Sequence, residues 1–228
     1  MQKRLIRKLD LEVFLSQIDP HPSPKASLEQ YTIPADVAAT MLHMAAYNYQ
    51  DIVGKTILDL GCGTGRLAIG AAWLGAHQAV GIDIDKTAVG VASQNSMKAG
   101  LKDRLQWITA DVEVVRGEFD TVVQNPPFGV QKRGADRKFL QKALEVGKVI
   151  YSLHKNSGKV SLLNERPKVS RGSIVPVSPS PFIQNYVEKH GGAVKAVYAL
   201  PMSIPRMFDF HTKRKYQFAV NLYIITKQ

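Results

Sequence analysis

The stretch "LDLGCGTGRL", residues 58–67, predicts a tight turn between a buried strand and a helix. Its glycines alternate at positions 61, 63 and 65, and glycine adopts positive φ and lets a ligand approach the backbone closely. The pattern is not G-x-G-x-x-G, and no G-K-[ST] closes it as in a Walker A loop. Asp59 lies just before the first glycine. The stretch predicts either a ligand site of the nucleotide type or a plain tight turn.

Two further acids follow at the ends of the next two expected strands. Asp83 in "GIDID" lies about 20 residues after the turn, where an acid accepts hydrogen bonds from ribose hydroxyls. Asp111 in "TADV" ends the third strand, where it can accept from the exocyclic amine of an adenine. Because ligands bind at the carboxyl ends of parallel strands, three acids there favour the ligand site. Cys62 is interpreted as a residue that only fills space among the glycines, since no base is spaced to activate it as a nucleophile.

Apolar strands and helical stretches alternate along the chain around this turn. Because this spacing is typical of a parallel sheet covered on both faces, the sequence predicts an α/β fold. Including two late strands joined by residues 202–216, the predicted sheet has seven strands. They are expected at 55–61, 79–85, 105–111, 119–125, 149–154, 193–201 and 217–227.

Composition predicts a single core and a polyanionic partner. The 228 residues are 45% hydrophobic, which suffices for one sizeable core. Lys plus Arg total 30 against 19 acids, a net charge of +11, so nucleic acid is the first expectation and an anionic membrane surface the second.

One cysteine excludes a disulfide framework within the chain, and no metal is expected. With no signal-peptide pattern and no apolar run of ~20 residues, we expect a cytoplasmic location and no membrane partner.

The chain is expected to divide into an N-terminal attachment and one domain. Residues 1–27 predict an amphipathic helix followed by a linker, because "DPHPSPKAS" carries three prolines. Residues 28–228 predict a single domain. Within it, about 156–181 is rich in Ser, Pro, Lys and Arg and is interpreted as a surface insertion without an assigned role.

An aspartate before G-x-G-x-G, followed by a strand-end acid, resembles the class I S-adenosylmethionine-dependent methyltransferases over roughly residues 30–226. The resemblance implies a Rossmann-like fold with an antiparallel last strand, and S-adenosyl-L-methionine as cofactor. By analogy Asp59 lies close to the methionine amino group, and Asp83 holds the ribose. The remaining residues assigned to this cofactor site are Gly61, Gly63, Thr64, Ile84, Asp111, Val112 and Asn125.

The stretch "TVVQNPPFGV", residues 121–130, ends the fourth strand, which in such a sheet ends beside the transferred methyl group. The carbonyls of the Asn125 side chain and the Pro126 backbone can each accept one N–H of an exocyclic amine, which orients its lone pair. Pro127 adds rigidity and Phe128 a face for stacking. These four residues are the predicted catalytic set, although N-P-P alone is more often a strand-ending turn. Nucleobases and glutamine side chains both fit, and the charge favours nucleobases.

Four further stretches narrow the resemblance: "LEQYTIP" (28–34), "GADRKFLQKALE" (134–145), "YSLHK" (151–155) and "FDFHTKRK" (208–215). Together they resemble the small-subunit ribosomal RNA adenine-N6 methyltransferases of eukaryotes and archaea. The resemblance implies N6-methylation of adenine in RNA, and a segment closing over the cofactor with Gln30 and Thr32 as binding residues. It also implies a small zinc-binding activator subunit that pairs with a sheet edge to form a heterodimer.

Two basic runs are predicted to contact RNA, because lysine and arginine bind phosphates. One flanks the N-P-P-F motif and the other precedes the last strand. The alternative for the second run is a solvated loop. The residues are Lys132, Arg133, Arg137, Lys138, Lys213, Arg214 and Lys215. His154 at a strand end is expected either to face the cleft or to be a structural histidine.

Two other functions stay open on the sequence alone. One is an amine methyltransferase acting on DNA or on protein glutamine, against which Phe128 weighs mildly, because the glutamine-modifying relatives more often carry tyrosine there. The other is a non-catalytic RNA-binding assembly factor. The intact acids and Asn125 argue against that second function.

Overall fold

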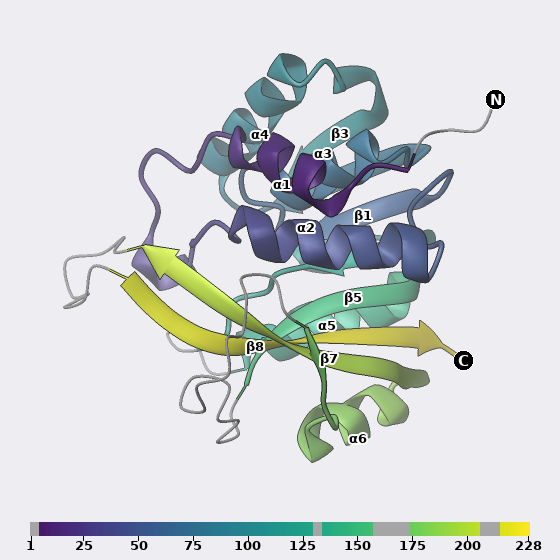
Figure 1. Cartoon of the computed structure of the whole chain (residues 1–228). Helices are drawn as coiled ribbons and strands as arrows, with labels where there is room; N and C mark the ends of the chain where they lie inside the picture. The colour runs from purple at the N-terminus through teal and green to yellow at the C-terminus, as the bar shows by residue number, and fades with distance from the viewer. Residues whose placement is uncertain (1–4, 130–133, 157–173, 206–214) are drawn as a thin grey trace.

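The computed structural model describes residues 5–129, 134–156, 174–205 and 215–228. In chain order the elements are α1 (Lys8–Ser16), η1 (Ala26–Leu28), α2 (Ala35–His43), η2 (Met44–Asn48), β1 (Thr56–Leu60), α3 (Arg66–Trp73), β2 (Gln78–Asp83), α4 (Lys86–Lys98), η3 (Lys102–Arg104), β3 (Leu105–Thr109), η4 (Val112–Val114), β4 (Phe119–Gln124), α5 (Ala135–Val146), β5 (Gly147–Lys155), β6 (Val175–Pro176), α6 (Pro181–Lys189), β7 (Gly192–Pro205) and β8 (Lys215–Lys227). Figure 1 shows them arranged around one sheet.

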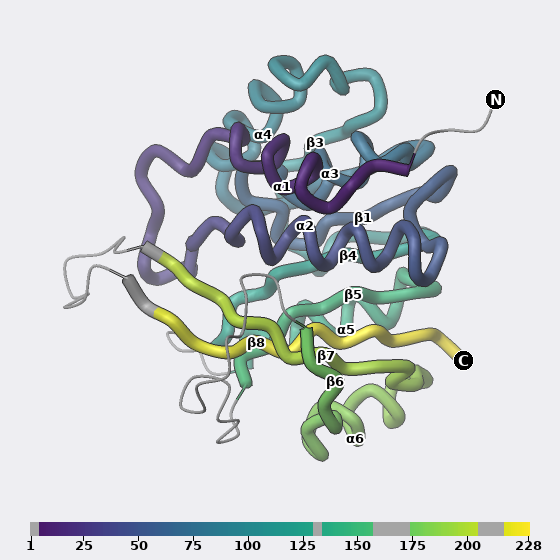
Figure 2. Tube along the Cα trace, in the orientation of Figure 1, coloured from purple at the N-terminus to yellow at the C-terminus, as the bar shows by residue number. Residues whose placement is uncertain are grey.

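The sheet has the strand order β3-β2-β1-β4-β5-β8-β7-β6. The strands from β3 to β5 pair in parallel, and β8 pairs antiparallel with both β5 and β7. The chain order reverses at β1, which has β2 on one side and β4 on the other. Figure 2 shows β4 next to β1. In open α/β sheets ligands bind outside the strand ends at this reversal. The fold therefore places the glycine turn, which follows β1, at the expected ligand site.

The predicted fold class is confirmed, but the predicted strand count is wrong. The sheet is mostly parallel, carries helices on both faces and includes the antiparallel β8 as the last strand of the chain, but it has eight strands rather than seven. The extra strand, β6, pairs its two residues with Ala199 and Tyr198 inside the range interpreted as an insertion. A two-residue strand containing a proline is too short to give a periodic pattern.

The hairpin of β7 and β8 is longer than the sequence predicts. Its ladder runs from Gly192 opposite Lys227 to Pro205 opposite Lys215, and so enters the range 202–216 expected as a connection. Pro201 and Pro205 concealed this extension, because proline lacks an N–H and argues against a strand. Proline is tolerated at an edge, and among the described residues β6 pairs with β7 only at two positions before Pro201.

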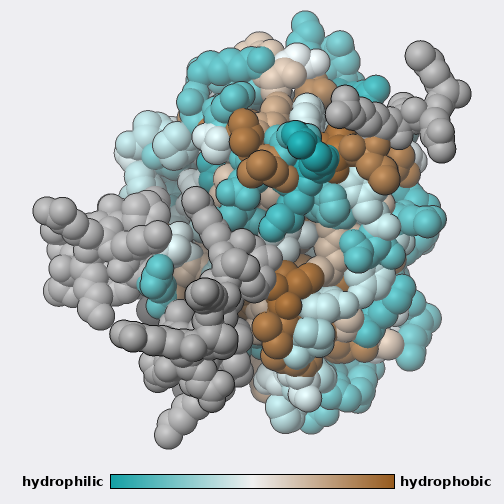
Figure 3. Space-filling model, viewed as in Figure 1, coloured by the Kyte–Doolittle hydropathy of each residue, from teal (hydrophilic) through white to brown (hydrophobic). Residues whose placement is uncertain are grey.

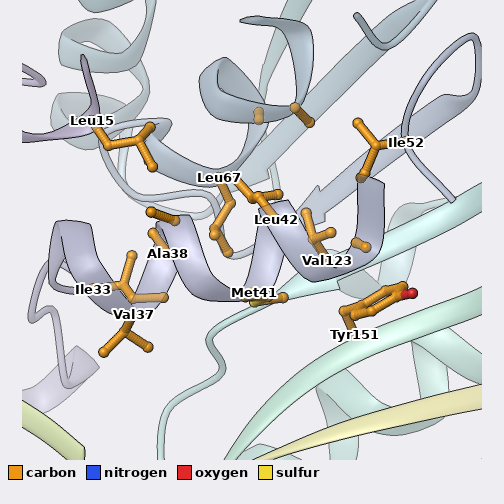
Figure 4. Close-up of a cluster of buried hydrophobic side chains, with 14 of the residues drawn as sticks. Leu15, Ile33, Val37, Ala38, Met41, Leu42, Ile52, Leu67, Val123 and Tyr151 are labelled. Carbon is orange, nitrogen blue, oxygen red and sulfur yellow. The ribbon is translucent and has the colours of Figure 1, made fainter. Parts of the chain in front are cut away.

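One face of the sheet packs against α1, α2 and α3. Met41 and Leu42 of α2 are fully buried beside Val123 of β4 and Tyr151 of β5 (Figure 4). A Cβ on Gly70 of α3 would lie 2.5 Å from Leu42 and 3.0 Å from Leu15 of α1. This close approach makes the N-terminal helix α1 part of the main core.

The opposite face packs against α5 and α6. Leu140 and Leu144 lie one turn apart on α5, as an amphipathic helix requires, and Val187 comes from α6. They cover Ile150 and Ile225 of the sheet, so each face has its own hydrophobic cluster.

Some apolar side chains lie on the surface. Leu5, Leu9 and Val13 follow one another at four-residue intervals and are more than half exposed. Around α1, Figure 3 shows hydrophobic and hydrophilic residues interleaved. No helix in the described part of the chain is long and apolar enough to cross a membrane.

Candidate active site

A cavity of about 320 Å³ lies at the carboxyl ends of β1, β2 and β4. Its volume falls within the range of small-molecule sites, roughly 300–1,000 Å³. Every residue that the sequence assigns to the cofactor site lines this cavity. Of the predicted catalytic set Asn125 and Pro127 line it, whereas Pro126 and Phe128 do not. The fold and the sequence motifs therefore indicate the same location for the ligand site.

The glycine turn follows β1 in a conformation that glycine adopts most readily. Gly61, Gly63 and Gly65 have φ values of 71°, 52° and 86°. A Cβ on Gly65 would lie 2.4 Å from Trp107, and one on Gly61 would lie 2.8 Å from Phe139. The predicted positive φ is therefore confirmed, and close packing adds a second reason for glycine at two of the three positions.

Asp59 lies beneath the turn and is 1% exposed. One carboxylate oxygen accepts a hydrogen bond from the backbone N–H of Ala68 at 3.0 Å. Burial raises the pKa of Asp59 to about 7, because a buried carboxylate loses the hydration that favours its charged form. A cation beside it would favour the ionised form.

Asp83 joins the glycine turn to the end of β2. Its Oδ2 accepts from the N–H of Gly63 at 2.8 Å, and its Oδ1 accepts from the N–H of Asp85 at 2.9 Å. Burial raises its pKa in spite of these two bonds. Each carboxylate oxygen can accept a second hydrogen bond, so Asp83 can also receive two hydroxyl donors from the cavity.

Asp111 is already paired on both oxygens. Its Oδ1 accepts from the N–H of Glu113 at 2.9 Å, and Lys138 Nζ lies 2.8 Å from its Oδ2. Lys138 also lies 3.4 Å from Glu113 Oε1 and lines the cavity. The structure therefore places Lys138, which the sequence assigns to RNA, beside the residues assigned to the cofactor.

The segment between α1 and α2 crosses the cavity. Gln30 donates from Nε2 to Asp85 Oδ2 at 3.0 Å and accepts from the N–H of Lys25 at 2.8 Å. Arg66 of α3 donates to the carbonyls of Ile33 at 2.5 Å and Ile18 at 3.1 Å. Burial lowers the pKa of Arg66 to about 10. These bonds hold the segment that contains Gln30 and Thr32 against the strand ends.

The N-P-P-F motif leaves β4 toward the cavity. The side-chain oxygen of Asn125 is buried and has no hydrogen-bond partner among the described residues. The ring of Phe128 packs between Tyr31 and Phe218, with centroid distances of 5.7 and 5.9 Å. Its N–H donates to Glu29 Oε2 at 2.8 Å. The motif therefore presents a free acceptor and is held by aromatic and carboxylate neighbours.

A buried polar chain lies next to the motif. Gln124 donates from Nε2 to Ser152 Oγ, and Ser152 Oγ lies 2.8 Å from His154 Nε2. All three side chains are buried, and burial lowers the pKa of His154 to about 4. His154 does not line the described cavity, so of the two expectations the structural one applies.

The predicted RNA contacts are only partly within the described residues. Lys132, Arg133, Lys213 and Arg214 lie outside them, and only the backbone of Lys215, the first residue of β8, is described. Arg137 belongs to the first turn of α5, where its N–H donates to the Gly134 carbonyl at 3.2 Å. Their RNA contacts stay predictions.

Several cavity residues were not predicted. His21 lies in the proline-rich stretch, Arg66 follows the last glycine of the turn, and Phe139 comes from α5. Glu29 and Tyr31 lie beside the predicted Gln30. All five lie in stretches that the sequence analysis quotes, so their signal was proximity to the assigned residues rather than a pattern of their own. The described residues contain no cluster of His, Cys, Asp and Glu that could hold a metal ion.

Comparison with known proteins adds relatives along nearly the whole chain. A family model described as ribosomal protein L11 methyltransferase matches residues 36–126. An uncharacterized protein of Methanocaldococcus jannaschii is 37% identical and covers 98% of this chain and 95% of its own length. The rRNA N(6)-adenosine-methyltransferase of Drosophila melanogaster is 38% identical, over 77% of this chain and 84% of its own length.

A solved structure agrees with the sequence relatives. The crystal structure of a protein from Pyrococcus horikoshii, designated there as a candidate RNA methyltransferase, has a TM-score of 0.82 and 34% identity. The matched region covers 98% of this chain and 99% of the Pyrococcus chain. The similarity therefore includes the N-terminal segment and the β7–β8 hairpin as well as the sheet.

Proposed function

This chain belongs to the family of the rRNA N(6)-adenosine-methyltransferases, and we propose that it methylates the N6 amine of an adenine in small-subunit ribosomal RNA. It is a methyltransferase of the class I fold, and its proposed cofactor is S-adenosylmethionine. One observation carries the proposal: the Asn125 side-chain oxygen is buried at the cavity without a partner among the described residues. An unpaired buried acceptor is costly, which favours a ligand that donates to it.

The residues present fit the cofactor. When bound, S-adenosylmethionine supplies an electrophilic methyl group on a sulfonium centre. Asp59 is proposed to face its ammonium group, which would favour the ionised carboxylate that burial disfavours. Asp83 is proposed to accept from the ribose hydroxyls, and Asp111 from the adenine amine. The hydroxyl of Thr64, buried in the cavity wall with no partner among the described residues, offers a further donor or acceptor.

Asn125 is proposed to orient the substrate amine. The lone pair of an exocyclic amine is delocalised into the base, which makes the nitrogen a weak nucleophile. If the Asn125 side chain and the Pro126 backbone carbonyl each accept one N–H, the nitrogen becomes more pyramidal and its lone pair points away from both acceptors. Positive charge that develops on this nitrogen is stabilised by the same two oxygens. The two prolines keep these oxygens in place because proline has a fixed φ.

Phe128 is proposed to help seat the base. A base stacked on an aromatic ring gains about 1–3 kcal/mol. The Phe128 ring is partly buried against Tyr31 and Phe218. A base that reaches this ring must leave its own stack, which costs a few kcal/mol in a duplex and less in a single strand. The arrangement therefore favours an adenine in an unpaired or opened region of RNA.

The distribution of charge supports a polyanionic substrate. The ranges 1–4, 130–133, 157–173 and 206–214 together contain 11 of the 30 Lys and Arg residues but only two acids. Three of these ranges follow the carboxyl ends of β4, β5 and β7. Because β4 and β5 are parallel, and β8 is antiparallel to both β5 and β7, these three ends lie at the edge that bears the cavity. Positive charge there would attract RNA phosphates.

A small zinc-binding activator subunit is proposed as partner, pairing with the sheet edge formed by β3. Ile108 on β3 is 43% exposed, and Ile84, which follows β2, is 57% exposed. An open strand with apolar neighbours is a suitable site for a partner strand. Replacing Ile108 by aspartate is expected to abolish a heterodimer seen by size-exclusion chromatography. A heterodimer that survives the change would contradict this edge. With ribosomal RNA as substrate, the proposed location is the cytoplasm.

Protein or DNA amine methylation is the main competing function. The match to the ribosomal protein L11 methyltransferase model ends at residue 126, so it covers the cofactor half and does not extend past the middle of the N-P-P-F motif. The deciding experiment supplies labelled S-adenosylmethionine with purified ribosomal RNA, DNA and ribosomal protein in separate reactions. Label in ribosomal RNA alone is expected. Label in protein or DNA alone would overturn the proposed substrate.

A further inference from the structure

Glu29 links the segment over the cofactor cavity to the N-P-P-F motif. Its Oε2 accepts from the backbone N–H of Phe128 at 2.8 Å, although the two residues are 99 positions apart. The same oxygen accepts from the hydroxyl of Tyr31 at 3.0 Å. Glu29 is 8% exposed, so both bonds form where water competes little.

Of the two residues that follow Glu29, Gln30 contacts the opposite side of the cavity and Tyr31 contacts the same side. Gln30 binds Asp85 just beyond the end of β2, while Glu29 binds Phe128 beyond the end of β4. The ring of Tyr31 packs on that of Phe128. Three consecutive residues therefore span the cavity from the cofactor side to the side of Asn125.

The backbone at Glu29 has a left-handed conformation. Its φ and ψ are 51° and 40°, a left-handed conformation that is unfavourable for residues with a Cβ. Among the described non-glycine residues only Gln50 shares a positive φ. Such conformations persist where surrounding contacts enforce them, and they gather at functional sites.

We propose that Glu29 is a positioning residue: its carboxylate fixes the N-P-P-F turn through the Phe128 N–H, so that closure of the 29–32 segment over the cofactor sets the place of Asn125. The consequence for RNA methylation rests on the proposed function. The coupling between segment and turn rests only on the contacts above.

The first test is hydrogen exchange with and without S-adenosylhomocysteine, in the absence of RNA. Pro126 and Pro127 have no amide hydrogen, so within 125–128 only Asn125 and Phe128 carry one, and exchange at Phe128 is the readout. The product is expected to slow Phe128 exchange by about tenfold in the wild type and in Glu29→Gln, whose amide oxygen can replace the acceptor. In Glu29→Ala the exchange should be fast and should not respond.

The second test separates turnover from cofactor binding. Glu29→Ala is expected to lower kcat by about 10- to 100-fold, since small displacements at a reacting centre cost this much, and to change the cofactor Kd by less than about fivefold. Glu29→Gln should restore kcat to within about threefold of the wild type. Glu118→Ala, which removes an exposed carboxylate paired with Lys148, is the control and should change neither value.

The outcomes distinguish the two proposals. If Glu29→Ala turns over like the wild type, if it keeps the exchange response, or if Glu29→Gln fails as Glu29→Ala does, the positioning role is wrong. If Glu29→Ala does not fold, Glu29→Leu fills the same space without an acceptor and is held to the same criteria. Should the wild type methylate something other than RNA while the exchange results hold, the proposed function fails and the coupling stands.

Discussion

The two halves of the cavity hold their polar groups in different ways. On the cofactor side, Asp59 and Asp83 accept hydrogen bonds from backbone N–H groups of the elements around them. On the other side, the Asn125 oxygen has no partner in the described chain, and its motif is held by Glu29. One half is organised by local backbone, whereas the other relies on a distant segment and keeps an acceptor for a ligand.

The largest expected effect is that of Asn125→Ala, which should impair turnover but not cofactor binding. Asn125→Ala removes an acceptor that acts on the reacting amine, so kcat should fall by about 100- to 1,000-fold. The cofactor Kd should stay within about threefold of the wild type, because the backbone bonds on Asp83 remain. Single-turnover transfer and calorimetry measure the two values. A matching loss of cofactor affinity would show that the halves are not separate.

A change on the cofactor side should give the reverse pattern. Asp83→Ala removes a charged acceptor of two backbone N–H groups and of the proposed ribose contacts. At about 1.5–3 kcal/mol for such bonds, the cofactor Kd should rise by roughly 10- to 100-fold. Calorimetry with S-adenosylhomocysteine checks this, with circular dichroism as the folding control. Unchanged affinity would remove Asp83 from the site.

The glycine turn gives a prediction on stability. Gly65→Ala would place a Cβ 2.4 Å from Trp107 at a φ of 86°. Overpacking and backbone strain should together lower the free energy of unfolding by about 2–4 kcal/mol. Urea denaturation measures this loss. Gly90→Ala, where a Cβ meets open space within a helix, is the matched control and should not destabilise the protein. Equal stability of all three proteins would contradict the packing seen here.

The cofactor side should also show a pH dependence of stability. Asp59 has a pKa of about 7 when folded and about 3.9 when unfolded, so the folded state binds the proton more tightly. Without cofactor, the free energy of unfolding should therefore fall as the pH rises from about 4 to 7, and Asp83, whose pKa is also raised, contributes with the same sign. Chemical denaturation across this range checks the direction.

Cofactor binding should show the opposite trend. An ammonium group prefers the ionised Asp59, so affinity should increase roughly tenfold between pH 6 and pH 7.5. Asp59→Asn should flatten most of this dependence. A wild-type Kd that does not change with pH would contradict the placing of an ammonium group beside Asp59.

The cofactor side could be predicted from sequence because its signals are local. The glycines, Asp83 and Asp111 lie at fixed places after strands, and parallel strands bring those places together. Burial of Asp59 follows in the same way from the apolar strand that precedes the turn.

The other side depends on contacts that no spacing encodes. The bond between Glu29 and Phe128 joins residues 99 positions apart, and nothing in the order of residues indicates it. Lys138 was expected to contact RNA because of its charge, but its ion pair with Asp111 is set by the packing of α5 against β5, β4 and η4. The sequence did not predict β6 or the far end of the β7–β8 hairpin, because both contain prolines, which argue against strands.

The most direct measurement identifies the methylated atom. Ribosomal RNA labelled by the wild-type protein is digested to nucleosides, and the labelled nucleoside is identified by chromatography and mass spectrometry. The geometry of Asn125 predicts N6-methyladenosine. Label on a ring nitrogen, on a ribose hydroxyl or on cytidine would contradict the central claim that this motif holds the exocyclic amine of an adenine.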